Sequence, residues 1–402
     1  MPRTTTPTAQ YLDTDAAVAR WLASIRTSAI LALDTEGASF HRFVDRIYLL
    51  QLSTRDQHAI IDPLPIGTPG LLGEIVQDPK VEIVFHDADY DLRLLRQDYG
   101  WQIRNVFDTR IAAQLIGLKA FGLAALLERS FGLKLDKKHQ RADWSMRPLT
   151  ADMLDYAAQD TMHLLGLRDI LHEELRQKGR LEWAQEEFLR LENIGWAQEE
   201  PGQAFLKVKG ARDLTRRELA LFKELVVWRD AAALKLDRAT FRVVSNEVLF
   251  EAARTAPTAK SELGKIKGMP RGILERSGEE LLEAIVRGQA VPEGELPKFP
   301  KSARWDRDPD FDHKVGALKA VRDDAATRLE LDPGVLCSRE RMEVVARQLP
   351  GEPAEIEQIP DFRKWQVAEL GEGFVKALKP WAKKASTKDT PKDAPKDSPY
   401  RD

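Results

Sequence analysis

The sequence predicts an α/β domain with a mixed sheet, followed by two all-α helical domains. Short β-forming segments near the start give way to β/α alternation, helical periodicity fills the rest, and proline-rich or glycine-rich stretches divide the chain. A chain of 402 residues also exceeds what one hydrophobic core usually organises. We expect domains at 1–200, 211–290 and 305–382, and a disordered tail at 383–402 that is poor in apolar residues.

The first domain begins with a predicted strand meander. Its segments are 29–33, 47–52 and 59–61, and the Pro/Gly-rich stretch 63–70 ends it. A helix at 71–77, a strand at 81–85 and a helix at 89–97 follow. This order indicates a mixed sheet with helices packed against it, not a purely parallel doubly wound fold.

The rest of the chain is predicted to be helical. One long amphipathic helix is expected over 150–171, and residues 195–213 are interpreted as a linker. Thr215 and Glu218 have the spacing of a capping box, which Ser277 and Glu280 repeat before another helix. The proline-rich run 291–300 then separates the second block from the third.

The third block resembles the second. Leu-Lys-Leu-Asp at 234–237 aligns with Leu-Glu-Leu-Asp at 329–332, and Pro257 falls near the equivalent of Pro350 if two residues are inserted. Chance similarity between two amphipathic helical segments also accounts for this pattern.

Composition restricts the class of protein. The single cysteine, Cys337, excludes an internal disulfide framework and a cysteine-based zinc site. The first ten residues lack the apolar core of a secretory signal, and no apolar run has transmembrane length. We therefore expect a cytoplasmic protein without a membrane partner. The net charge of −3 argues against binding polyanions by bulk charge alone.

Two carboxylates, Asp34 and Glu36, end a predicted strand, where alternate side chains share a face. Asp91 follows a second predicted strand, at the start of a helix. Each has another explanation, because the pair also fits a turn or a solvated sheet edge, and Asp91 also fits a helix cap.

Tyr156 and Asp160 are four residues apart and therefore share one helix face. The same spacing also fits an aromatic residue of the core next to an acidic residue that faces solvent. Asp34, Glu36, Asp91 and Asp160 together are hard oxygen ligands of the kind that bind Mg²⁺ or Mn²⁺. Two such ions can support in-line hydrolysis of a phosphodiester, with Tyr156 orienting the water. His86 could be a ligand or a buried, hydrogen-bonded histidine.

The carboxylate segments resemble a known family. Asp34-Thr-Glu36, the stretch from His86 to Asp91 and Tyr156-Ala-Ala-Gln-Asp160 look like the three exonuclease motifs of the DEDD superfamily, in its tyrosine subclass. Residues 135–149 are similar to a segment typical of ribonuclease D and its close relatives.

This segment carries candidate nucleic-acid contacts, which are Gln140, Arg141, Trp144 and Arg147. A structural turn held by Trp144 is the alternative.

The resemblance continues beyond the first domain. Residues 214–287 look like an HRDC helical domain, with cues in Trp228-Arg-Asp230 and Pro257, and residues 308–380 resemble a second, divergent copy. The likeness implies a ribonuclease H-like fold for residues 1–200, with strands one to three antiparallel. Gly37 departs from the family, because many relatives carry a bulky apolar residue there.

The resemblance implies a metal-dependent 3′→5′ exoribonuclease that uses two divalent cations, Mg²⁺ or Mn²⁺, and releases nucleoside 5′-monophosphates. Its substrate would be RNA with a free 3′ end, such as precursor transfer RNA, bound by a monomeric protein. A 3′→5′ DNA exonuclease remains open, because recognition of the 2′-hydroxyl depends on pocket geometry. A non-catalytic RNA-binding scaffold also remains open, and binding without hydrolysis would identify it.

Overall fold

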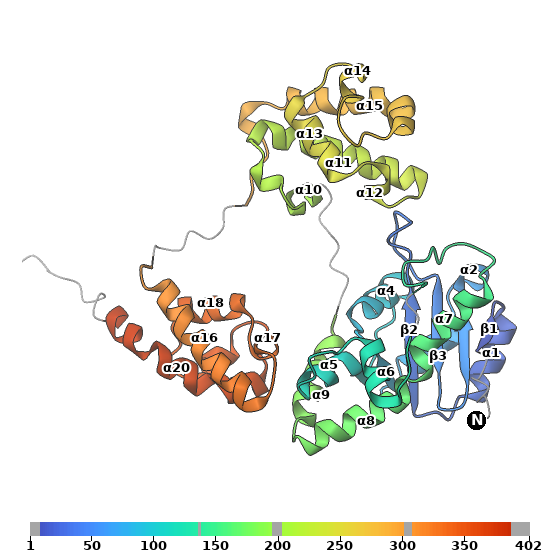
Figure 1. Cartoon of the computed structure of the whole chain (residues 1–402), viewed down its shortest axis with the longest axis vertical. Helices are drawn as coiled ribbons and strands as arrows, with labels where there is room; N and C mark the ends of the chain where they lie inside the picture. Colours follow the sequence, from blue (N-terminus) through green and yellow to red (C-terminus); the bar gives the residue numbers. More distant parts are fainter. Residues whose placement is uncertain (1–8, 136–137, 195–202, 301–307, 387–402) are drawn as a thin grey trace, which may run out of the picture.

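The computed structural model describes residues 9–135, 138–194, 203–300 and 308–386 (Figure 1). Its first part is a six-stranded sheet in the order β1-β4-β3-β2-β5-β6. The strands are β1 (Gln10–Leu12), β2 (Ile30–Glu36), β3 (Leu49–Ser53), β4 (His58–Ile61), β5 (Glu82–Phe85) and β6 (Val106–Asp108). As predicted, β2, β3 and β4 are antiparallel, while β1 pairs in parallel with β4, and β5 and β6 continue in parallel from β2. The sheet is therefore mixed.

Helices cover both faces of this sheet. They are α1 (Asp15–Ser24), α2 (Pro63–Ile66), α3 (Gly70–Val76), α4 (Asp89–Tyr99), α5 (Thr109–Leu115), α6 (Leu123–Phe131), α7 (Ala151–Met162), α8 (Leu164–Gln177) and α9 (Leu181–Leu191). Leu31 and Leu33 of β2 belong to the core formed with α1, α3 and α4, whereas Ala32 belongs to the core formed with α5 and α8. Alternation along β2 thus assigns successive side chains to opposite layers.

The single helix expected over 150–171 is two helices in the structure. His163, at φ −108° and ψ −1°, separates α7 from α8. Ala157 and Ala158 of α7 pack with the core over β3 and β4, while the leucines of α8 join the core over β2 and β5 on the same face of the sheet. The chain changes direction because the two apolar faces are buried against different parts of the sheet.

A first helical bundle follows. It contains α10 (Ala204–Lys207), the 3₁₀ turn η1 (Ala211–Asp213), α11 (Arg216–Leu236), α12 (Thr240–Val243), α13 (Asn246–Thr255), α14 (Lys260–Leu263), α15 (Arg271–Ala290) and the 3₁₀ turn η2 (Glu293–Glu295). The predicted capping box is confirmed, since Thr215 and Glu218 exchange both hydrogen bonds.

The helix start expected at Ser277 coincides with a break, because Ser277, with φ −131° and ψ 15°, is a non-helical residue at a kink that joins two helical parts of α15. Another expectation for this region was wrong. The expected linker over 195–213 contains α10, because Phe205 is buried in the core of the bundle. Residues 195–202 of that linker lie outside the described residues.

The second bundle repeats the first. Its helices are α16 (Phe311–Leu329), α17 (Pro333–Leu336), α18 (Arg339–Gln348), α19 (Pro353–Glu357) and α20 (Lys364–Ser386). Helices α11 and α16 each end at a residue with a left-handed backbone conformation, Asp237 and Glu330, and these two residues are 93 positions apart. The same offset of 93 residues relates the first residue of α12 to that of α17, of α13 to that of α18, and of α15 to that of α20. The sequence alignment of Asp237 with Asp332 was therefore two residues out of register.

The C-terminal boundary also differs from the expectation. Helix α20 extends to Ser386, so the expected tail does not start at residue 383. The remainder of that tail, 387–402, lies outside the described residues. No helix in the described ranges is both long and apolar enough to cross a membrane.

The second bundle packs against the sheet domain through α9. Trp183 stacks on Trp365 with ring centroids 4.7 Å apart, and Arg363 Nε donates to Glu187 at 3.0 Å. Glu186 accepts hydrogen bonds from the backbone N–H of Lys364 and of Trp365, which begin α20. The apolar core is continuous across this contact. Deleting residues 308–386 would therefore expose apolar surface of this shared core.

We expect Glu187→Ala to weaken this contact by about 3 kcal/mol, because it leaves the guanidinium of Arg363, 7% exposed, without its charged partner. Hydrogen exchange in α9 and α20 measures the effect. Glu173→Ala is the matched control, since it breaks an exposed Glu–Arg pair with Arg176 on α8 and should change little. Equal exchange rates in the two variants would contradict the assigned role of Glu187.

Candidate active site

The end of β2 presents two carboxylates to one face of the sheet. Asp34 and Glu36 alternate with Thr35, and they pair across to Gln51 and Leu49 of the antiparallel neighbour β3. Directly opposite residues in an antiparallel pair share a face, so both acids lie on the side covered by α7. The strand thus fixes the direction of both side chains.

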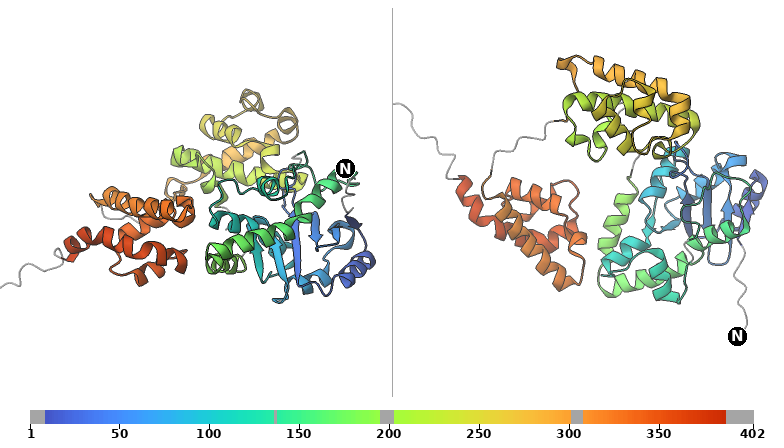
Figure 2. Two further views of the ribbon diagram at one scale, coloured as in Figure 1. Left: turned by 60° about the horizontal axis from the view of Figure 1, so that its bottom comes forward. Right: turned by 45° about the horizontal axis from the view of Figure 1, so that its top comes forward.

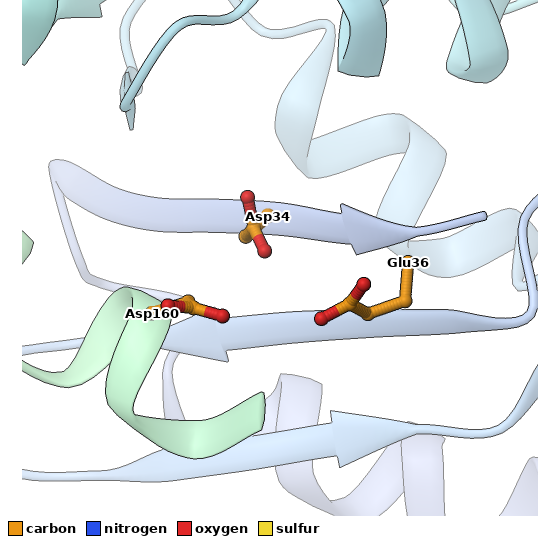
Figure 3. Close-up of side chains that lie close together, drawn as sticks. All are labelled: Asp34, Glu36 and Asp160. Carbon is orange, nitrogen blue, oxygen red and sulfur yellow. The ribbon is translucent and has the colours of Figure 1, made fainter. Parts of the chain in front are cut away.

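Helix α7 brings a third carboxylate to this position. One carboxylate oxygen from each of three residues, Asp34, Glu36 and Asp160, lies within 4.8 Å of the other two. Figure 3 shows Asp34 and Glu36 on one strand and Asp160 reaching toward them from the helix. The structure therefore brings together three of the four predicted metal ligands.

The fourth carboxylate, Asp91, comes from α4 on the opposite layer. It is 5% exposed, and its Oδ1 accepts hydrogen bonds from Thr35 N at 3.1 Å and Thr35 Oγ1 at 2.5 Å. It is not the cap of α4, since Ala88 holds that position and donates its N–H to Asp108. Thr35, which the sequence analysis did not single out, therefore ties Asp91 to the strand that carries the other two acids.

Burial and mutual repulsion raise the pKa of all four carboxyls. For Asp34, loss of solvent is the largest cause, followed by the charge of Asp160, and Glu36 responds in the same way to burial and to Asp34. Burial and then the charge of Asp91 raise the pKa of Asp160 to about 7, and burial and Asp34 raise that of Asp91.

Within the described residues, none of these acids forms an ion pair with arginine or lysine. A hard divalent cation supplies the positive charge that such an oxygen cluster requires, so the residues fit a metal site.

The carboxylates line a cavity of about 660 Å³. Tyr156 lies one helical turn before Asp160 and also faces the cavity, between the rings of His139 and Trp144 at centroid distances of 5.9 and 6.1 Å. Its ring is therefore held by packing on two sides, while the cavity wall includes its side chain.

His86 also borders the cavity, but its geometry favours the second of the two explanations given for it. Its Nδ1 lies 2.9 Å from Thr109 Oγ1, and burial lowers its pKa to about 4, so the ring is neutral. The carboxylate cluster does not include His86.

The four candidate nucleic-acid contacts separate into two pairs. Gln140 and Arg141 are exposed and line the cavity. Trp144 is 2% exposed, and Arg147 donates to Asp62 Oδ1 at 2.8 Å as well as to backbone carbonyls. Trp144 borders the cavity but is almost completely buried, and Arg147 is paired with Asp62, so both residues favour the alternative of a structural turn. Direct RNA contact by these two residues stays a prediction.

Gly37 lies close to two other side chains, so any side chain at this position would require those neighbours to move. A Cβ atom there would be 2.5 Å from the hydroxyl of Tyr90 and 2.8 Å from Asp45 Oδ1. Tyr90 and Asp45 are hydrogen-bonded to each other, and Asp45 also accepts from Ala38 N at 3.2 Å. The Tyr90–Asp45 pair thus fills the volume beside Glu36 that a bulky residue would need.

Comparison with protein families agrees with the fold and the site. Residues 9–176 match the model of the 3′–5′ exonuclease family, and residues 218–285 and 315–378 each match the HRDC domain. The first match contains the four carboxylates and Tyr156. The sheet, the acidic cluster and this match define a 3′→5′ exonuclease that uses divalent metal ions.

Curated relatives identify the family more closely. The chain is 31% identical over 335 residues to ribonuclease D of Granulibacter bethesdensis, covering 82% of this chain and 84% of that one. It is 30% identical over 334 residues to ribonuclease D of Escherichia coli, covering 83% and 88%. The chain belongs to the ribonuclease D family and is a 3′→5′ exoribonuclease.

Solved structures show the same architecture. The crystal structure of Escherichia coli RNase D aligns with a TM-score of 0.72 at 27% identity, over 93% of this chain and 99% of that one. The catalytic core of RRP6 from Trypanosoma brucei aligns with a TM-score of 0.64 at 28% identity, over 72% and 81%.

We expect Thr35→Val to weaken metal-dependent activity by about 10- to 100-fold, the usual effect of removing a hydrogen bond that orients a metal ligand. The substitution keeps the shape of the side chain and removes the 2.5 Å bond to Asp91. The loss of activity is measured by titrating the activity of wild type and variant against Mg²⁺ concentration. An unchanged half-saturating concentration and an unchanged kcat would show that Thr35 does not position Asp91.

Proposed function

We propose that this chain trims the 3′ ends of structured RNA, with precursor transfer RNA as a substrate, and that it uses two divalent cations, Mg²⁺ or Mn²⁺. The observation that carries the proposal is the convergence of Asp34, Glu36 and Asp160 within 4.8 Å, with Asp91 fixed beside them by Thr35. The structure of the Escherichia coli relative is described as that of an exoribonuclease involved in structured RNA processing, which supports the choice of substrate.

The proposed roles follow from where each side chain lies. Asp34, Glu36, Asp91 and Asp160 would hold the ions. When bound, such ions lower the pKa of water and stabilise negative charge on the leaving oxygen. Tyr156, packed between His139 and Trp144, would orient the attacking water through its hydroxyl. The products would be a nucleoside 5′-monophosphate and an RNA shortened by one nucleotide.

Substrate binding would begin at the mouth of the cavity. Gln140 and Arg141 are exposed there, and a guanidinium can contact a phosphate or stack on a base. We propose a monomer that works in the cytoplasm. The free cysteine, Cys337, is buried, which is compatible with a reducing compartment.

Digestion of end-labelled RNA tests the reaction and its direction. With Mg²⁺ or Mn²⁺, a 3′-labelled strand should release labelled mononucleotide at once, and a 5′-labelled strand should shorten stepwise. EDTA should stop both. Digestion of a DNA strand of the same sequence tests the alternative that DNA is the substrate. If DNA were digested faster than RNA, we would conclude that the enzyme is a DNA exonuclease. Binding without hydrolysis under every metal would favour the non-catalytic scaffold.

We expect Asp160→Asn, and likewise Asp34→Asn, to abolish hydrolysis while keeping the fold, because a metal ligand is lost. Removing one buried charge also relieves repulsion, so thermal unfolding without metal should occur at the same or a higher temperature than in wild type. Stabilisation by added Mg²⁺ should then be smaller. Asp155→Asn is the matched control, because Asp155 is exposed on the same helix. Near-normal activity of Asp160→Asn would remove Asp160 from the site.

We expect Tyr156→Phe to reduce kcat by about 100-fold, at the lower end of the contribution of a positioned proton-handling group. The ring packing against His139 and Trp144 would remain, so Mg²⁺ should still raise the unfolding temperature as it does in wild type. Single-turnover kinetics measure the chemical step directly. A wild-type rate in this variant would mean that the hydroxyl of Tyr156 takes no part in the reaction.

A further inference from the structure

We propose that an aromatic platform contributed by two domains binds the RNA strand where it leaves the active site. This platform consists of Phe40 in the β2–β3 loop, Phe241 in α12, and the arginines Arg141 and Arg242 that lie beside these rings. The inference rests on the proposed RNA substrate and adds a binding surface for the nucleotides upstream of the 3′ end. A 3′→5′ exonuclease holds the terminal nucleotide at the carboxylates, so the upstream strand must pass over the rim of the cavity.

The platform is continuous with the cavity. The β2–β3 loop starts directly after Glu36, and Phe40 and His41 line the same cavity as the carboxylates, as does Arg141. Figures 1 and 2 show this loop extending from the end of the sheet toward α12 of the first bundle. A strand leaving the carboxylates in this direction meets Phe40 and then Phe241.

Both rings are exposed although both are large and apolar. Phe40 is 47% exposed and Phe241 53% exposed, and their centroids are 6.5 Å apart at an interplanar angle of 78°. The guanidinium carbon of Arg141 lies 5.4 Å from the centroid of Phe40, and that of Arg242 lies 5.9 Å from the centroid of Phe241. Exposed aromatic faces beside exposed guanidinium groups are what single-stranded nucleic acid binds, by base stacking and phosphate contact.

Hydrogen bonds across the domain boundary hold the loop in place. Ala239 N donates to His41 O at 3.2 Å, and Arg242 Nε donates to Phe40 O. Arg42 bridges the two domains, because its Nη1 donates to Asp237 Oδ2 at 3.2 Å and its Nε donates to Ser145 Oγ at 2.6 Å. The platform is therefore ordered before RNA arrives, which lowers the entropy lost on binding.

The second bundle shows that docking by itself does not require an aromatic residue at this turn. The equivalent turn of that bundle also contacts the sheet domain, since Leu329 O accepts from Arg180 Nη2 at 2.6 Å and Glu330 pairs with Lys178 at 3.4 Å. At the positions equivalent to Phe241 and Arg242, 93 residues later, that turn has Gly334 and Val335. The same structural element docks in both bundles, and only the copy at the cavity rim carries the Phe–Arg pair.

Replacing Phe241 tests the platform. In an Asp160→Asn background, which we expect to bind RNA without cleaving it, fluorescence anisotropy with a single-stranded RNA of about twelve nucleotides measures affinity. Phe241→Ala and Phe241→Leu should each weaken binding by about tenfold, the order expected for one lost stacking contact, and Phe241→Trp should retain it. Val286→Ala is the matched control, because Val286 is 61% exposed on α15 of the same bundle.

The active enzyme provides a second readout. The ratio of kcat/KM for the long strand to kcat/KM for a dinucleotide should fall about tenfold in Phe241→Ala and Phe241→Leu, because Phe241 lies outside the lining of the carboxylate cavity in which a dinucleotide would bind. Wild-type affinity and an unchanged ratio in both variants would overturn the inference. Equal loss for Phe241→Trp would also overturn it, since that variant keeps an aromatic face. Failure of the wild type to degrade any RNA would instead contradict the proposed function.

Discussion

The crowding of like charges at the end of β2 is the constraint on which the rest of the site depends. Asp34, Glu36 and Asp160 place oxygen atoms within 4.8 Å of one another in a region largely removed from solvent. Such a cluster repels itself and persists only because a strand, a helix on each layer and the surrounding core fix the backbone at each position. The favourable free energy of folding therefore holds the carboxylates together despite their repulsion. A bound divalent cation would compensate their negative charge.

Each part of the sheet domain contributes to holding that cluster. The break at His163 lets α7 lie over the end of β2, while α8 packs elsewhere, so Asp160 can face the strand. Thr35 points to the opposite layer from its two acidic neighbours and reaches Asp91 there. The alternation of a single strand thus links ligands that come from both faces of the sheet.

The two helical bundles show how one module can be used in two ways. Both contact the sheet domain through the turn that follows their first long helix, at Asp237 in one and Glu330 in the other. In the second bundle the contact is supported by a stacked tryptophan pair and a continuous apolar core. In the first bundle the contact is more polar and adjoins the cavity, so this copy can influence what reaches the carboxylates.

The sequence by itself determined the ligand chemistry, the antiparallel start of the sheet and the helical character of the rest, because these follow from local alternation, capping and resemblance of motifs. It missed β1, β6 and the division of the helix over 150–171, since three-residue strands and a helix break depend on which distant surface buries each segment. Only the tertiary structure separated exposed Arg141 from buried Trp144, which lie in one motif. Contacts distant in sequence set that difference, and no local pattern encodes them.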